Sequence, residues 1–75
     1  MERIPVFSDT IASVGFDETT EVLEVQFLNG VVYHYLGVSI ELYAFLMASG
    51  NFNEIYFFRE IKGKYKEHQV TLRIR

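Results

Sequence analysis

Apolar and polar residues alternate strictly in two neighbouring segments, and this pattern predicts a β-hairpin. Residues 21–28 form the first strand, and its apolar face consists of Leu23, Val25 and Phe27. Residues 31–36 form the second, antiparallel strand, which has Tyr33 and Tyr35 on one face and His34 on the other. Asn29-Gly30 lies between the two strands. Both residues tolerate positive φ, which favours a two-residue type I′ turn.

Other segments predict a strand on either side of this hairpin and two helices. The strands span residues 11–16 and 70–75, the second with arginines that suit a sheet edge. A helix over residues 40–49 follows Ser39, a good N-cap. A second, short helix spans residues 54–61. Around Pro5 we expect only an extended lead-in. The pattern predicts one α+β domain over residues 1–75, a small antiparallel sheet packed against one longer and one short helix.

The composition adds an apolar surplus to this picture. Of the 75 residues, 49% are hydrophobic and twelve are aromatic, seven Phe and five Tyr. A domain this small buries only about 60% of the surface of its unfolded chain. The surplus therefore predicts an apolar surface patch, for which Tyr35, Tyr56 and Phe58 are candidates, and self-association as a dimer.

The chain has no cysteine, and this excludes several classes of site. Disulfides, thiolate metal sites and a cysteine nucleophile are all ruled out. A reducing cytoplasm is the expected location. No apolar stretch approaches the roughly 20 residues that a membrane helix needs, so we expect no membrane association.

Charge is distributed unevenly along the chain. Residues 1–54 carry eight acidic residues against one basic residue, a net charge of −7. Residues 55–75 carry six basic residues against two acidic ones, a net charge of +4. Such asymmetry indicates either a directed electrostatic contact with a partner or attraction between the two ends of the fold.

The basic segment includes aromatic residues, so it is a candidate contact for nucleic acid or for a protein partner. The candidate residues are Arg59, Lys62, Lys64, Tyr65 and Lys66. Cations neutralise phosphates, and aromatic rings stack on unpaired bases. The alternative is a short helix with its aromatic rings in the core and its lysines in water. The net charge of −3 for the whole chain favours this alternative.

No residue pattern indicates catalysis. His34 and His68 could approach each other and form a metal site with Glu24 or Glu67, but no ligand spacing supports one. The serines lack the context of a catalytic triad, and no glycine motif for phosphate is present. We therefore expect no enzyme activity, no metal and no cofactor.

Several fragments of the chain occur in a recognisable order. They are Ile11-Ala12-Ser13-Val14-Gly15-Phe16-Asp17, then Leu23-Glu24-Val25-Gln26-Phe27 with Asn29-Gly30, then Tyr33-His34-Tyr35, then Val38, Tyr43 and Leu46, and last Tyr56-Phe57-Phe58-Arg59-Glu60-Ile61-Lys62-Gly63-Lys64-Tyr65. Together they resemble the KTSC domain, which occurs at the C-terminus of some lysyl-tRNA synthetases and as short bacterial and phage proteins. The resemblance covers about residues 8–66.

The resemblance implies a small antiparallel sheet packed with helices, and it says little about function. The link to a tRNA synthetase suggests RNA binding by association alone. The sequence departs from the family pattern at three positions, with Ser39 in place of Pro, Phe58 in place of Asn and Lys62 in place of Arg.

Two function classes follow. The first is a non-catalytic protein-interaction module that self-associates. Such a module could be a bacterial or phage protein that binds or inhibits a host protein. The alternative is a nucleic-acid-binding module that uses the basic C-terminal third. An acidic face and exposed aromatic residues favour the first class.

Overall fold

The computed structural model describes residues 2–48 and 50–70. Within these residues, antiparallel pairing joins five strands into one sheet in the order β1-β2-β3-β4-β5. The strands are β1 (Arg3–Pro5), β2 (Ile11–Asp17), β3 (Val22–Phe27), β4 (Val32–Leu36) and β5 (Lys66–Val70). Helices α1 (Ile40–Leu46) and α2 (Glu54–Glu60) lie between β4 and β5 in the chain. The α+β class predicted from the sequence is confirmed.

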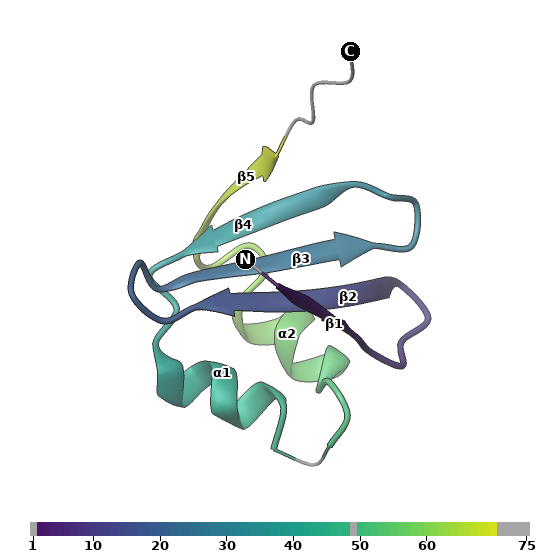
Figure 1. Ribbon diagram of the computed structural model, residues 1–75, viewed down its shortest axis with the longest axis horizontal. Coiled ribbons are helices and arrows are strands. Elements are labelled where there is room, and N and C mark those ends of the chain that lie inside the picture. Colours follow the sequence, from purple (N-terminus) through teal and green to yellow (C-terminus); the bar gives the residue numbers. More distant parts are fainter. Residues whose placement is uncertain (1, 49, 71–75) are drawn as a thin grey trace.

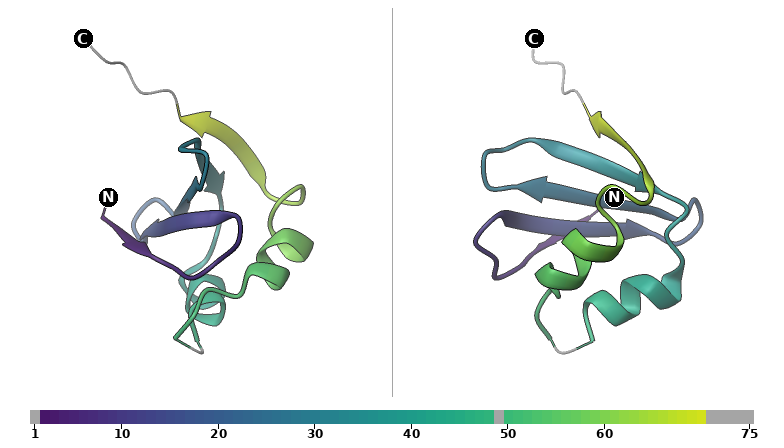
Figure 2. Two further views of the ribbon diagram at one scale, coloured as in Figure 1. Left: turned by 90° about the vertical axis from the view of Figure 1, so that its right-hand side faces the viewer. Right: turned by 180° about the vertical axis from the view of Figure 1, so that it is seen from behind.

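Both helices cover the same face of the sheet (Figures 1 and 2). The core lies between this face and the helices, and Phe57 of α2 is fully buried there. The Phe57 ring meets the rings of Tyr35 at 5.3 Å, Phe52 at 5.5 Å and Phe27 at 6.5 Å between centroids. The predicted apolar face of the hairpin is therefore the one that contacts the helices.

The hairpin is present, but the predicted type I′ turn is wrong. The loop has three residues, 28–30, and is closed by hydrogen bonds from Phe27 N–H to Val31 C=O (2.8 Å) and from Gly30 N–H to Phe27 C=O (2.9 Å). Gly30 has φ +92°, whereas Asn29 does not have positive φ. The Asn29 side chain instead accepts from Val31 N–H at 3.0 Å. This is the three-residue hairpin loop with glycine at the left-handed position.

Helix α1 begins as predicted and ends earlier. Ser39 caps it by accepting from Leu42 N–H at 3.1 Å. The helix ends at Leu46 rather than at residue 49, because the N–H groups of Ala48 and Gly50 bond three residues back, to Phe45 and Met47. Ser49 itself lies outside the described residues. Helix α2 is confirmed, with Asn53 as its N-cap.

The last strand begins four residues earlier than predicted. Strand β5 begins at Lys66 and pairs with β4 from Leu36↔Lys66 to Val32↔Val70. Backbone pairing along β4 fixes this strand although its sequence lacks the expected alternation. Residues 71–75 of the predicted strand lie outside the described part of the chain. Within that part, no helix has the length and apolar character needed to cross a membrane.

Candidate functional site

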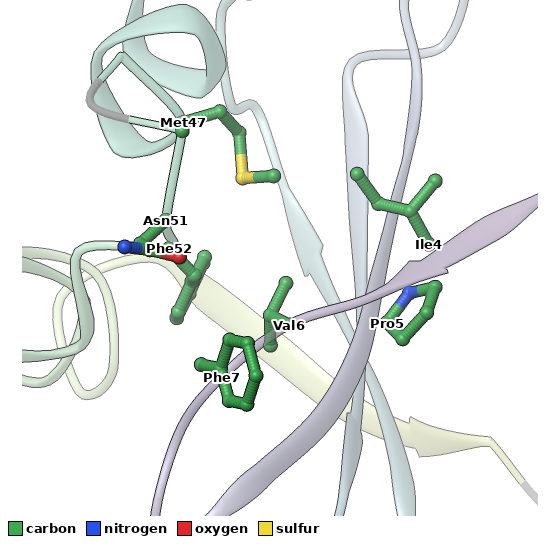
Figure 3. A pocket seen from close by; sticks show the side chains of 8 residues that line it. Ile4, Pro5, Val6, Phe7, Met47, Asn51 and Phe52 are labelled. Carbon is green, nitrogen blue, oxygen red and sulfur yellow. The ribbon is translucent and has the colours of Figure 1, made fainter.

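An apolar hollow of about 470 Å³ opens beside β1. The residues that line it come from two chain segments, and they are Ile4, Pro5, Val6, Phe7, Met47, Gly50, Asn51 and Phe52. One wall is β1 with the residues that follow it, and the other is the connection between α1 and α2 (Figure 3). This volume and apolar lining are typical of sites that take an apolar group of a ligand or partner.

The hollow has a buried floor and an exposed rim. Phe52 is only 5% exposed and packs against Phe57, so the floor belongs to the core. Phe7 is 88% exposed and Ile4 is 48% exposed. An aromatic side chain left this open to water loses the hydrophobic stabilisation that burial would give it, about 1.5–3 kcal/mol. Covering the hollow would recover that free energy.

Strand β1 reaches its place because Gly15 opposite it has no side chain. A Cβ on Gly15 would lie 2.6 Å from the Glu2 carbonyl oxygen and 3.0 Å from Arg3 Cγ. The Arg3 side chain instead crosses β2 and bonds to Glu24 Oε2 on β3 at 2.8 Å. The close approach of β1 to β2 thus positions the wall of the hollow.

The segment after β1 is attached to α2 through one carboxylate. Ser8 Oγ donates to Glu54 Oε1 at 2.8 Å, and Thr10 Oγ1 donates to Glu54 Oε2 at 2.5 Å. Hydrogen bonds from Thr10 and then Ser8 lower the pKa of Glu54, so the carboxylate stays ionised. The hollow is therefore held between the sheet and the helices rather than on an unsupported loop.

Most of the predicted basic contact residues are paired within the fold. Arg59 Nε lies 3.2 Å and Lys64 Nζ 3.6 Å from the Glu60 carboxylate. Lys62 Nζ lies 3.6 Å from Glu67 and 5.5 Å from the centre of the Tyr33 ring.

Of the remaining two candidates, Tyr65 packs against the core and Lys66 makes no ion pair with a described residue. The segment therefore does not present a continuous row of unpaired cations.

The predicted apolar patch is not one surface. Tyr35 is fully buried, so the prediction that it is exposed is wrong. It pairs with the buried Leu23 of β3 and lies on the face of the sheet that the helices cover. Burial and, to a lesser degree, the charge of Glu67 raise the pKa of the Tyr35 hydroxyl. Tyr56 packs on Phe45, with ring centroids 4.6 Å apart, and Phe58 is 37% exposed beside Phe57.

The histidines do approach each other, as partners across β4 and β5. The rings of His34 and His68 are 5.7 Å apart between centroids, and His34 Nε2 lies 2.7 Å from Glu24 Oε1. Among the described residues, no three His, Asp or Glu side chains are placed to hold a metal ion. The bond to Glu24 gives His34 a structural partner on the open face of the sheet.

Sequence reasoning missed the hollow, because its two walls are some forty residues apart in the chain. A local signal did exist. Val6 and Phe7 are adjacent apolar residues that follow Pro5 and belong to no alternating segment. Such residues outside any strand or helix pattern are candidates for an apolar surface.

The arrangement of sheet and helices recurs in known proteins. A crystal structure of a KTSC domain protein from Yersinia pestis matches with a TM-score of 0.77 and 35% identity, over 93% of this chain and 97% of the other. An uncharacterised protein of Stutzerimonas stutzeri (strain A1501) is 30% identical over 60 residues, 75% of this chain and 84% of its own. The sequence profile of the KTSC domain matches residues 7–65. With most of its length matched in sequence and in structure, the chain belongs to the KTSC domain family.

Proposed function

We propose that this KTSC domain is a non-catalytic protein-interaction module that takes an apolar side chain of a partner into the hollow. The observation that carries the proposal is Phe7, 88% exposed at the rim of a hollow whose floor is the buried Phe52. Interfaces obtain most of their binding free energy from a few apolar or aromatic anchors in such depressions. The supported walls described above suit this role, because little conformational entropy is lost when a partner binds.

The alternative, a nucleic-acid module built on the basic segment, has less support. Arg59, Lys62 and Lys64 are each within 4 Å of a carboxylate, so a phosphate would have to compete with Glu60 and Glu67. The net charge of −3 also repels a polyanion. These features favour a protein partner.

The test is affinity capture from the native host with the tagged chain, with and without nuclease. Phe7→Ser removes the exposed ring at the hollow. Ile55→Ser is the matched control, because Ile55 is 75% exposed on α2 and does not line the hollow. We expect a nuclease-resistant protein that is recovered by the wild type and by Ile55→Ser and lost with Phe7→Ser.

Two outcomes would contradict this assignment. Recovery that disappears on nuclease treatment would move the nucleic-acid function to first place. Equal recovery by Phe7→Ser and the wild type would show that the partner binds elsewhere.

A further inference from the structure

We propose that the hollow binds residues 71–75 of a second copy of this chain, so that two copies exchange these segments and form a dimer. The inference rests on the proposed function, since it names one occupant of the same hollow. Three observations carry it: the edge of β1 that no described strand pairs with, the sequence of residues 71–75, and the position of Val70, the last described residue of β5.

The hollow adjoins a strand edge that has no partner among the described residues. Strand β1 pairs with β2 alone. Val6 N–H donates to Ala12 C=O, and strand alternation therefore turns the backbone of Arg3 and Pro5 away from β2. Proline has no N–H, but the Arg3 N–H and the carbonyl groups of Arg3 and Pro5 are available to an added strand.

The sequence of residues 71–75 suits this edge. Thr71-Leu72-Arg73-Ile74-Arg75 alternates, so in an extended conformation Leu72 and Ile74 lie on one side, where they can enter the hollow. The segment carries two arginines and no acid. The residues on either side of the hollow wall include Glu2 and Asp9, whose carboxylates make no ion pair with a described residue.

Residues 71–75 are short compared with the distance along the sheet to the hollow of their own chain. Val70 lies in the same row of the sheet as Pro5, through the pairs Val70↔Val32, Val32↔Gln26, Gln26↔Ser13 and Ser13↔Pro5. Four strand spacings separate these two residues, roughly 19 Å. Ile74 is four residues beyond Val70, which spans at most about 14 Å. Residues 71–75 are therefore better placed to enter the hollow of another copy than their own, and reciprocal exchange between two copies would close the assembly as a two-fold dimer.

The experiment is a complementation test with the full chain, followed by light scattering. The segment variant is Leu72→Ser with Ile74→Ser, the hollow variant is Phe7→Ser, and Ile55→Ser is the control. The wild type and the control should have twice the 8.8 kDa mass of one chain, and each of the other variants alone should be monomeric. A tagged segment variant should then capture the untagged hollow variant, because one intact hollow and one intact segment remain between them.

Three results would overturn the exchange. They are a monomeric wild type at high micromolar concentration, a dimer that survives the segment variant, and two monomeric variants that do not bind each other. If Phe7→Ser disrupts a dimer that the segment variant leaves intact, the hollow is an interface with a different occupant and the proposed function stands. A monomeric wild type leaves that function to be decided by the capture experiment.

Discussion

Replacing Phe57 with alanine is expected to lower the free energy of unfolding by about 3–5 kcal/mol, the usual cost of deleting a fully buried phenylalanine. Phe57 is 0% exposed and packs against aromatic rings from β3, β4 and the residues before α2. A chain of this length has a total stability of about 4–11 kcal/mol. Urea denaturation followed by circular dichroism measures the loss.

The neighbouring residue supplies the control for this prediction. Phe58 is 37% exposed, and its ring lies 5.1 Å from that of Phe57. Phe58→Ala should cost clearly less than Phe57→Ala, because water already covers part of its ring. If Phe57→Ala fails to fold, Phe57→Leu leaves a smaller cavity and should give a measurable intermediate loss. Equal losses at the two positions would contradict the arrangement of the core.

The second large effect is expected at Gly15, where an added methyl group should displace β1. A Cβ would lie 2.6 Å from the Glu2 carbonyl oxygen, and that backbone atom can move only with the strand. We expect Gly15→Ala to cost about 1–3 kcal/mol, the usual range for overpacking. Chemical denaturation gives the cost, and hydrogen exchange at the Ile4 amide reports whether β1 has detached.

A substitution at Arg3 distinguishes the two contacts that a methyl group on Gly15 would make, one with the Glu2 carbonyl oxygen and one with the Arg3 side chain. Arg3→Ala removes Cγ, which would lie 3.0 Å from the added methyl group, but leaves the Glu2 oxygen in place. The penalty of Gly15→Ala should therefore persist in the Arg3→Ala background. A penalty that vanishes in this background, or one below about 0.5 kcal/mol, would contradict the role of Gly15 in the close approach of β1.

Alternation of apolar and polar residues and helix-capping residues predicted the elements that depend mainly on neighbouring residues in the chain. Alternation located β3 and β4, and the N-cap at Ser39 marked where α1 begins. The type of the hairpin turn was missed because Asn-Gly is compatible with both a two-residue and a three-residue loop. Which loop forms depends on the pairing of the strands on either side, and residue preferences do not specify that register.

Long-range packing determined what the sequence did not predict. Tyr33 and Tyr35 were placed on one face correctly, but only the position of α2 shows that this face is covered and that Tyr35 is buried. Strand β1 has three residues, one of them proline. It can pair with β2 because Gly15 has no side chain that would collide with it. The hollow needs both β1 and the connection between the helices, so no single segment predicts it.

The most direct test of the hollow as the interaction site is an amide chemical-shift map of the 15N-labelled chain, titrated with the partner recovered by affinity capture. Binding at the hollow predicts that the largest changes fall at Ile4, Val6, Phe7, Met47 and Phe52, with α2 residues around Arg59 little affected. Changes confined to Arg59, Lys62, Lys64 and Lys66, with the hollow undisturbed, would contradict the account.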